Sequence, residues 1–143
     1  MLRVKTTIGL SRLHGVGLFA DQFIKRGTIT WQYDKGLDPD FSFEDLDQLA
    51  KDHKIMFEKY GYRDFDLNRF IVCIDDQRFI NHSSKNFNIL SSPNKDIAAR
   101  DIEKGEELLC NYNDYEQGWF EIRNLEEKEF VDLDILSKQQ TSD

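Results

Sequence analysis

The sequence predicts one mainly β domain with a few helices, and three observations support this fold class. The chain has 143 residues, a length that suits one domain with its own core. It is 39% hydrophobic and 13% aromatic, with eleven Phe, which is enough apolar material to fill that core. Short runs rich in β-branched and aromatic residues alternate with Gly-containing turns over most of the chain, as is typical of β-strands.

Strands are predicted where such runs occur. In the first third of the chain they cover residues 4–9 (VKTTIG), 17–21 (GLFAD) and 28–33 (TITWQY). Another strand is predicted at residues 69–74 (RFIVCI). The segments 96–102 (DIAARDI) and 107–112 (ELLCNY) are interpreted as two strands joined by a Gly-containing turn.

Two regions have the spacing of helices. From Ser42 to about Tyr60, apolar residues recur three and four positions apart, which predicts a helix capped by Ser42 and ended by Gly61. Residues 119–136 show similar spacing, which predicts one or two helices as a C-terminal extension of a single domain spanning residues 1–136. The polar residues 137–143 are expected to form a disordered tail.

Two segments share one turn pattern. In FIKRGTI and in DIEKGEE, an Ile is followed by two polar residues and a Gly. We expect Ile24 and Ile102 to point into the core. Gly27 and Gly105 then end tight turns whose last residue requires a positive φ.

Charge and cysteine content narrow the function classes. With 27 acidic and 19 basic side chains, the net charge of -8 repels phosphate backbones, so direct nucleic-acid binding is not expected. Cys73 and Cys110 lie in apolar stretches without a second Cys or His at zinc spacing, so we expect buried thiols and no zinc. No apolar stretch approaches the roughly 18 residues of a membrane span, and the first residues do not resemble a signal peptide. The sequence therefore predicts a soluble intracellular protein without a membrane partner.

Several polar or Gly-rich stretches interrupt the strands, and each alone is typical of a turn or of packing. In LHGVGLFA (13–20), two glycines allow close approach to a ligand, but no helix follows, which excludes a dinucleotide-binding fingerprint. In RFINHSS (78–84), Asn81 offers both a donor and an acceptor. Tyr112 ends the strand in ELLCNYND, and Trp31 and Tyr33 lie late in the third strand.

Taken in order, three stretches resemble the SET domain of protein lysine methyltransferases: GVGLFADQFIKRGTIT, RFINHSS and IAARDIEKGEELLCNY. The resemblance covers about residues 4–115. It implies a β-clip-like fold of small curved sheets with a pseudoknot-like C-terminal crossing, an exception to the un-knotted default. It also implies one pocket for S-adenosyl-L-methionine, with S-adenosyl-L-homocysteine as product, and a narrow channel that admits the target lysine from the opposite face.

The resemblance also assigns candidate site residues. The proposed cofactor-binding residues are His14, Gly15, Val16, Gly17, Tyr62, Asn81 and His82. The proposed catalytic residues are Tyr112, which faces the methyl-transfer centre, and Tyr33, which forms a wall of the lysine channel. A lysine must lose its proton before it can accept a methyl group, and a tyrosine with a pKa near 10 is poorly suited to be the base. We therefore assign Tyr112 an orienting role.

The chain also departs from the family pattern. It lacks the cysteine-rich zinc-binding flanks of many histone-directed members. Family members often carry an aromatic residue two positions before the motif tyrosine, which influences the number of methyl groups added. Here that residue is Cys110, so the methylation state stays open. Trp119 and Phe120 either fold over the lysine channel or serve only helix packing.

Three functions remain open from the sequence. The first is methyl transfer to a lysine in a basic segment of a protein, possibly a histone, drawn to an acidic surface. Such an enzyme would act in the cytoplasm, or at host chromatin if its target is a histone. The second is a catalytically inactive SET-fold module that binds other proteins. The third is methyl transfer to another amine or to a non-histone protein. The oligomeric state stays open.

Overall fold

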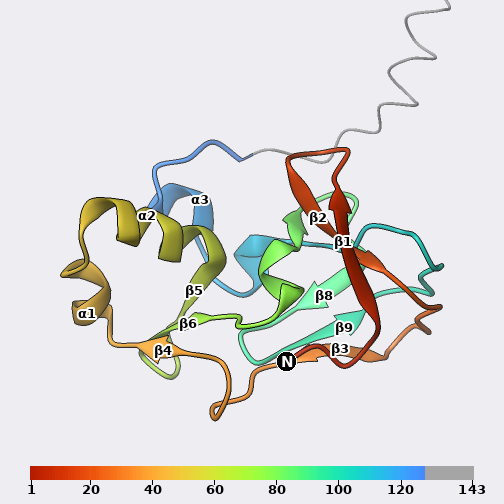
Figure 1. Ribbon diagram of the computed structural model, residues 1–143, viewed down its shortest axis with the longest axis horizontal. Helices are drawn as coiled ribbons and strands as arrows, with labels where there is room; N and C mark the ends of the chain where they lie inside the picture. The colour runs from red at the N-terminus through yellow and green to blue at the C-terminus, as the bar shows by residue number, and fades with distance from the viewer. Residues whose placement is uncertain (128–143) are drawn as a thin grey trace, which may run out of the picture.

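The computed structural model describes residues 1–127, in which ten short strands, three α-helices and two 3₁₀ turns fold together (Figure 1). In chain order the elements are β1 (Thr6–Leu10), β2 (Val16–Ala20), β3 (Ile29–Gln32), β4 (Asp40–Phe41), α1 (Phe43–Asp47), α2 (Lys51–Tyr60), β5 (Gly61–Asp64), β6 (Arg69–Val72), η1 (Asp76–Phe79), β7 (Asn81–His82), β8 (Ile89–Ser91), β9 (Lys95–Ala98), β10 (Leu109–Cys110), η2 (Tyr112–Asp114) and α3 (Trp119–Ile122). The predicted mainly β fold with a few helices is confirmed.

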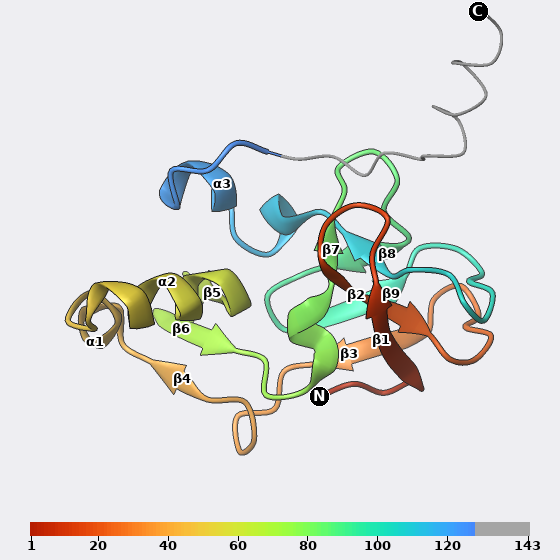
Figure 2. The same ribbon diagram turned by 45° about the horizontal axis from the view of Figure 1, so that its top comes forward.

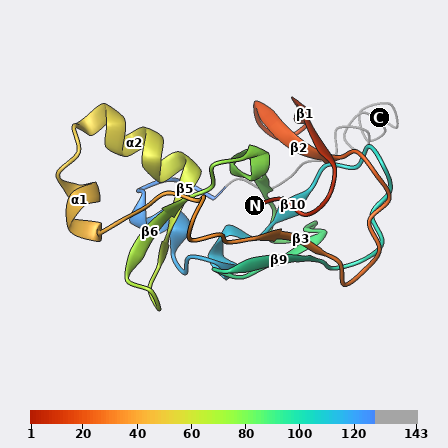
Figure 3. The same cartoon turned by 60° about the horizontal axis from the view of Figure 1, so that its bottom comes forward.

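The strands of the described part form three small sheets. β1 pairs with β2, the order β4-β6-β5 makes a three-stranded sheet, and the order β3-β9-β8-β10-β7 makes a five-stranded one. Figure 2 shows α1, α2 and the three-stranded sheet at one end of the molecule, with the β1–β2 hairpin and the five-stranded sheet at the other. Figure 3 shows α2 beside β5 and β6.

A crossing of the chain lies in the five-stranded sheet. β10 runs parallel to both β7 and β8 and inserts between them, so the loop joining β7 to β8 encloses it. Ser83 N–H donates to the Cys110 carbonyl at 3.0 Å. The Asn88 side chain donates to the Glu107 carbonyl and accepts from Leu109 N–H, both at 2.8 Å. The predicted pseudoknot-like crossing is therefore present, and the Asn88 amide holds it in place.

The two predicted turns are confirmed, and they lie side by side. Gly27 and Gly105 have φ values of +86° and +94°, and Ile24 and Ile102 are 1% and 0% exposed. Ile24 and Ile102 also exchange two backbone hydrogen bonds, at 2.9 and 2.8 Å. The two turns therefore pair through an antiparallel bridge between Ile24 and Ile102, which joins the segment after β2 to the segment after β9.

The predicted hairpin of residues 96–102 and 107–112 is wrong. β9 pairs antiparallel with β3 and β8, whereas β10 pairs in parallel with β7 and β8. The Gly105 turn between them bonds to β2 instead, through Gly105 N–H to the Ala20 carbonyl and Leu108 N–H to the Leu18 carbonyl, each at 2.8 Å. A turn pattern predicts where the chain reverses, but partner strands are selected by distant residues.

The predicted helix from Ser42 to Tyr60 is two helices. Ser42 caps α1 as expected, accepting from Asp45 N–H at 3.0 Å, but α1 ends at Asp47 and α2 starts at Lys51. Both helices pack on the three-stranded sheet, with Leu46 1% exposed and the Phe41 and Phe57 rings 5.3 Å apart. The helical spacing therefore continues across a break in the backbone.

The helix that starts at Trp119 ends earlier than predicted. Asn124 adopts a positive φ of 54°, its N–H donates to the Glu121 carbonyl at 3.1 Å, and Leu125 N–H donates to the Phe120 carbonyl at 2.9 Å. This pair of bonds is a Schellman motif, which ends a helix with a left-handed residue. Residues 128–136 of the predicted extension, and the tail 137–143, lie outside the described residues.

Two buried clusters form the core. One gathers residues of β2, β8, β9 and β10 with both turn isoleucines, and the other is made of Trp31, Tyr62, Ile71 and Cys73. Tyr115 packs against both clusters and so links them. The two cysteines are buried and free, as predicted. Among residues 1–127, none of the helices is long and apolar enough to cross a membrane.

Candidate functional site

Two cavities meet between the two ends of the molecule. The larger encloses about 1750 Å³ including its open mouth, and the smaller about 450 Å³. Their common wall consists of Lys59, Tyr60, Arg78, Ile80 and Tyr112. A group held in one cavity therefore lies close to a group held in the other, with Tyr112 between them.

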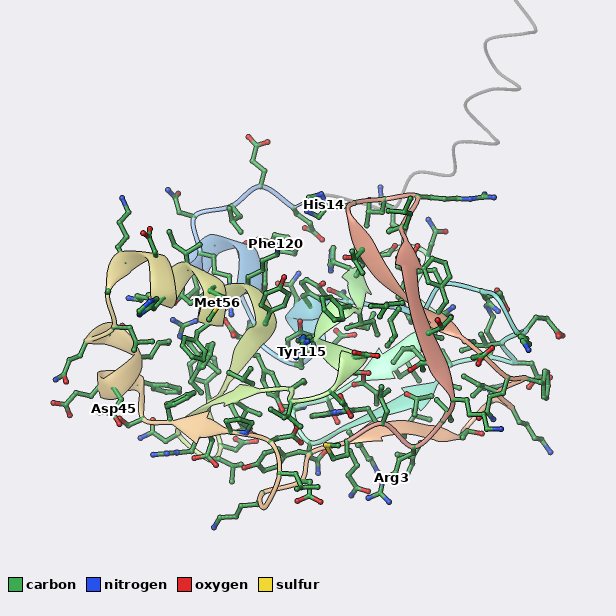
Figure 4. The ribbon with its side chains drawn as sticks, viewed as in Figure 1. Arg3, His14, Asp45, Met56, Tyr115 and Phe120 are labelled. Carbon is green, nitrogen blue, oxygen red and sulfur yellow. The ribbon has the colours of Figure 1, made fainter. Side chains whose placement is uncertain are left out.

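The larger cavity collects segments that are far apart in the sequence. The turn of the β1–β2 hairpin contributes residues 13–16, β7 contributes Asn81 and His82, and α3 contributes Trp119 and Phe120. In Figure 4, His14 and Phe120 lie at the same edge of the molecule, on the hairpin turn and on α3. The structure thus brings together five of the residues predicted to hold the cofactor: His14, Gly15, Val16, Asn81 and His82.

Asn81 fastens the hairpin to the five-stranded sheet. Its side-chain amide donates to the Val16 carbonyl at 3.1 Å, to the His14 carbonyl at 3.4 Å and to Glu107 Oε1 at 3.0 Å. Glu107 Oε2 also accepts from the Ser11 hydroxyl at 3.1 Å. Asn81 and Glu107 therefore fix the backbone that lines the cavity. Sequence reasoning missed Glu107, although its place in GEELLCNY offered a signal.

Gly17, also predicted to bind the cofactor, does not line the larger cavity. A Cβ on this residue would lie 2.2 Å from Glu107 Oε1 and 2.9 Å from its carboxyl carbon. Gly17 is therefore needed for the close approach of Glu107. It affects the cavity indirectly, because Glu107 in turn bonds to Asn81 and Ser11 and so fixes the hairpin.

The Gly17→Ala variant is expected to unfold more easily than the parent, by about 1–3 kcal/mol, because the new methyl group displaces the Glu107 carboxylate. Gly9→Ala is a matched control, since Gly9 is the register partner of Gly17 and its Cβ would meet the Phe19 ring at an ordinary 3.4 Å. Urea unfolding of both variants measures the difference. Equal losses would contradict the role given to Glu107.

His82 is held on both ring nitrogens. Its side chain is 4% exposed, Nδ1 accepts the Tyr112 backbone N–H at 3.0 Å, and Nε2 lies 2.8 Å from Glu127 Oε1. Since Nδ1 is an acceptor, the proton of the ring lies on Nε2 and points to Glu127. The ring also contacts Tyr112 and Phe120, with centroids 5.1 and 4.7 Å away. His82 thus joins β7, η2 and the segment after α3 at the wall of the larger cavity.

Tyr112 is fixed in one orientation. Its hydroxyl donates to the Ile80 carbonyl, and its ring lies parallel to Phe120 and 4.8 Å from Trp119. Burial raises the pKa of Tyr112 well above its usual value, so the hydroxyl stays protonated near neutral pH. The side chain can therefore act as a fixed hydrogen-bonding group but is a poor base.

Each cavity holds one unsatisfied donor. Among the described residues, the buried side-chain polar atoms without a hydrogen-bond partner are Nε1 of Trp31 and Nε1 of Trp119. Trp31 lines the smaller cavity and Trp119 the larger. Buried donors are nearly always satisfied in folded proteins, so these two indole N–H groups are exceptions within the described part of the fold.

A comparison with protein families matches residues 15–113 to the SET domain. The chain belongs to the SET-domain family. No curated protein sequence matches the chain significantly.

Solved structures with similar folds include polycomb repressive complexes. An apo form of the Chaetomium thermophilum complex with substitutions in Ezh2 is 24% identical, with a TM-score of 0.65 over 84% of this chain and 16% of that chain. The same complex in an autoinhibited conformation bound to S-adenosylmethionine is 23% identical, with a TM-score of 0.61 over 85% and 16% of the two chains. An active complex in its basal state is 26% identical, with a TM-score of 0.61 over 78% and 15%. This SET domain therefore spans about one sixth of the length of those chains, and the likeness shows the fold.

Tyr62, another residue predicted to bind the cofactor, lies apart from His14, Asn81 and His82. It lines the smaller cavity of this SET domain, where its hydroxyl donates to the Pro93 carbonyl and its ring meets Tyr115 edge to face at 5.2 Å. The larger cavity does not include it. Tyr62 follows Gly61 in β5, and both line the smaller cavity beside Lys59 and Tyr60 of α2.

Tyr33 lines neither cavity, so the structure does not place it as a wall of a channel. β3 ends at Gln32, and beyond it Tyr33 donates its hydroxyl to Asp40 Oδ2 at 3.1 Å. Burial and then this hydrogen bond raise the pKa of Tyr33 to about 12. The aromatic residue of β3 that does line the smaller cavity is Trp31.

An ionic cluster positions α3. The Glu116 side chain is fully buried and accepts from Arg123 at 2.5 and 3.0 Å and from the backbone N–H of Arg63 at 2.7 Å. Arg123 also donates to the carbonyls of Glu58 and Gly61, and its guanidinium lies 4.0 Å from the centroid of the Trp119 ring. These bonds tie α3 to α2 and β5, and so hold the aromatic wall of the larger cavity. Sequence reasoning missed this cluster.

Among the described residues, no three His, Cys, Asp or Glu side chains are arranged to hold a metal ion. The donors of the larger cavity are backbone groups of the hairpin, an amide, an imidazole, an indole and the side chains of Lys59, Arg78 and Arg123, which suit an organic ligand.

Proposed function

We propose that this SET domain is an S-adenosylmethionine-dependent protein lysine methyltransferase. The observation that carries the proposal is the position of Tyr112, which is fixed by its hydroxyl at the junction of two separate cavities. Two cavities that meet at one residue suit a reaction between two ligands that enter from different sides.

The residues of the larger cavity fit the cofactor. The hairpin backbone at residues 14–16 offers N–H and carbonyl groups, and Trp119 offers an unpaired buried N–H. The Tyr112, Trp119 and Phe120 rings supply apolar surface for an adenosine group. S-adenosylmethionine, when bound, supplies a methyl group on a positively charged sulfur. Asn81 and Glu107 support its site indirectly, by fixing the hairpin.

The residues of the smaller cavity fit a lysine side chain. Trp31, Tyr60, Tyr62, Tyr112 and Tyr115 surround it, and aromatic rings both cover an alkyl chain and attract a cationic amine. A buried amine beside a positively charged sulfur has a lowered pKa, because both desolvation and like charge disfavour the ammonium form. The cavity thus favours the neutral amine that methyl transfer requires.

Tyr112 orients the reaction. Its protonated hydroxyl and the Ile80 carbonyl form a fixed polar edge between the cavities. Holding two reacting groups in line can lower a barrier by on the order of 7 kcal/mol. The tyrosine contributes to this alignment and to the local electrostatics, without accepting the proton of the lysine.

The proposed substrate is a protein with a lysine in a basic segment, such as a histone or another basic protein. The net charge of -8 attracts such a segment at long range. The number of methyl groups transferred stays open, because Cys110 occupies the position where SET-domain proteins often carry an aromatic residue.

Two measurements test the proposal. Calorimetric titration with S-adenosylmethionine is expected to show binding, and the ligand at 100 times its Kd should stabilise the fold by about 2.7 kcal/mol. Incubation with radiolabelled S-adenosylmethionine and a mixture of basic proteins, including histones, should label lysine side chains. If the titration shows no binding heat and the cofactor causes no thermal shift, the result would favour an inactive module that binds other proteins. Cofactor binding without transfer to any lysine would contradict the proposal.

A further inference from the structure

Of the described residues that line the smaller cavity, only Asp96 is acidic. It lies in β9, opposite Trp31 of β3 and Ser91 of β8, and is 2% exposed. Its Oδ2 accepts from the Gln77 side-chain amide at 2.5 Å, and its Oδ1 accepts from the Ser91 hydroxyl. Burying a carboxylate is costly unless it is paired, and these two partners are neutral. Among the described residues, the side chains that bond to Asp96 therefore include no cation.

The walls around Asp96 suit a cation. The aromatic side chains of Trp31, Tyr62 and Tyr115 line the same cavity. Aromatic faces attract an ammonium group, most strongly where water is excluded. A buried acid together with aromatic walls is thus suited to an alkylammonium ion, and an apolar side chain would leave the acid uncompensated.

Paired strands connect Asp96 with the junction of the cavities. Burial raises the pKa of the Cys110 thiol, and a hydrogen bond with Ser91 opposes this shift. Ser91 bonds to Asp96, and its strand β8 lies between β9, which carries Asp96, and β10, which ends at Cys110, two positions before Tyr112. Asp96 and Tyr112 line the same cavity, so the carboxyl group lies on the cavity where the proposed reaction occurs.

We propose that Asp96 accepts the proton of the target ammonium ion in the smaller cavity, an inference that rests on the proposed function. One N–H bond of the ammonium breaks and an O–H bond forms on Asp96. The nitrogen keeps the electron pair, which would form the bond to the methyl carbon as the carbon–sulfur bond of S-adenosyl-L-methionine breaks and its electron pair stays on the sulfur of S-adenosyl-L-homocysteine. Asp96 supplies the base that Tyr112 cannot be.

The proton affinity of Asp96 suits this step. Burial raises the pKa of Asp96 to about 7, against opposing hydrogen bonds from Ser91 and Gln77 and the positive charge of the Met1 amino group. Near pH 7 the carboxyl group can therefore both take up and release a proton.

Other ionisable groups around the cavity are Lys59 of α2, Arg78 of η1, Cys73 and the tyrosines. Burial raises the pKa of Tyr62, Tyr112, Tyr115 and Cys73, so these groups stay neutral while Asp96 titrates.

The first test is the pH profile of methyl transfer to a histone mixture, with Asp96→Asn compared with the parent. The amide keeps the shape of the carboxyl group and can bond to Gln77 and Ser91, so the fold is expected to persist. The parent kcat/KM should rise with pH through about 7. Asp96→Asn should lose activity about 100-fold or more near neutral pH. It should regain activity as the pH approaches the pKa of a free lysine side chain, about 10. An equal loss at every pH, or no loss, would overturn the proposal.

Two further variants keep this test decisive. Asp64→Asn replaces another buried aspartate, which caps the turn at Asp66 and Leu67 and lines neither cavity, and it should follow the parent profile. Ser91→Ala removes a hydrogen bond that lowers the pKa of Asp96, so the rising limb of the profile should move to higher pH. If the rising limb of Ser91→Ala stays at the pH of the parent, a group other than Asp96 controls the rise in activity.

The second test does not depend on methyl transfer. n-Butylamine mimics a lysine side chain, and its binding can be measured by NMR titration with S-adenosyl-L-homocysteine present. The parent should bind it saturably, and Asp96→Asn should bind it at least about tenfold more weakly. Equal binding by the two proteins would overturn the role of Asp96. Binding that depends on Asp96, without methyl transfer to any protein, would instead overturn the proposed function and leave the amine site standing.

Discussion

Replacing Tyr112 with Phe is expected to reduce methyl transfer by about 100-fold or more, the usual effect of removing one fixed polar group from a reaction centre. The Tyr112 hydroxyl donates a hydrogen bond to the Ile80 carbonyl, and this bond fixes the side chain at the junction of the two cavities. Its loss leaves that carbonyl unsatisfied and frees the ring to shift against Trp119 and Phe120. Alignment of the two ligands suffers, whereas their separate binding sites persist.

Initial rates with radiolabelled cofactor measure this effect, and calorimetry shows whether the cofactor still binds. Tyr33→Phe is the matched control, because it also removes a tyrosine hydroxyl with one hydrogen bond, to Asp40, on a residue that lines neither cavity. It should retain most of the parent rate. A Tyr112→Phe variant as active as Tyr33→Phe would remove Tyr112 from the mechanism.

Much of the candidate site was predictable because its signals are local. Two glycines around Val16, the Asn81–His82 pair and a tyrosine after a strand are short patterns, and their order along the chain resembles one family. The positive φ of Gly27 and Gly105 follows from turn chemistry that extends over four residues. None of these predictions required knowledge of which strands pair.

The errors arose where a distant partner decides the structure. β10 was predicted in a hairpin with the preceding segment, yet it lies between β7 and β8, because the Asn88 side chain and Ser83 bind its backbone. Trp31 and Tyr33 look equivalent in the sequence, but only Trp31 lines a cavity, since Asp40 draws the Tyr33 hydroxyl away. Spacing along the chain contains no information about either partner.

Charged residues were the hardest to interpret. In a chain that is 32% charged, a Glu or an Arg is usually on a solvated surface. Glu107, Glu116 and Arg123 were therefore not selected, although two of their side chains are essentially buried and all three position the walls of the larger cavity. Only the fold shows that Arg63 and Arg123 converge on one carboxylate.

That convergence leads to the second large expected effect. Arg123→Ala should lower the free energy of unfolding by about 3–5 kcal/mol, because it leaves the fully buried Glu116 carboxylate without its bidentate partner. Arg63 remains, but its side-chain contact with Glu116 is 3.5 Å, compared with 2.5 and 3.0 Å for Arg123. Urea unfolding measures the loss. Cofactor binding should weaken as well, since the guanidinium also supports the Trp119 ring.

Two comparisons separate this effect from a general cost of removing an arginine. Arg100→Ala breaks an exposed pair with Glu106 and should cost less than about 1 kcal/mol, because water screens that pair. Arg123→Lys keeps the charge but not the planar fork that reaches Glu116, Glu58 and Gly61 together, so its loss should fall between the other two. If all three variants lost the same stability, the buried pairing would not be what holds α3. If Arg123→Ala lost stability while its affinity for the cofactor stayed unchanged, α3 would be a structural element only, and the wall it forms would not belong to the binding site.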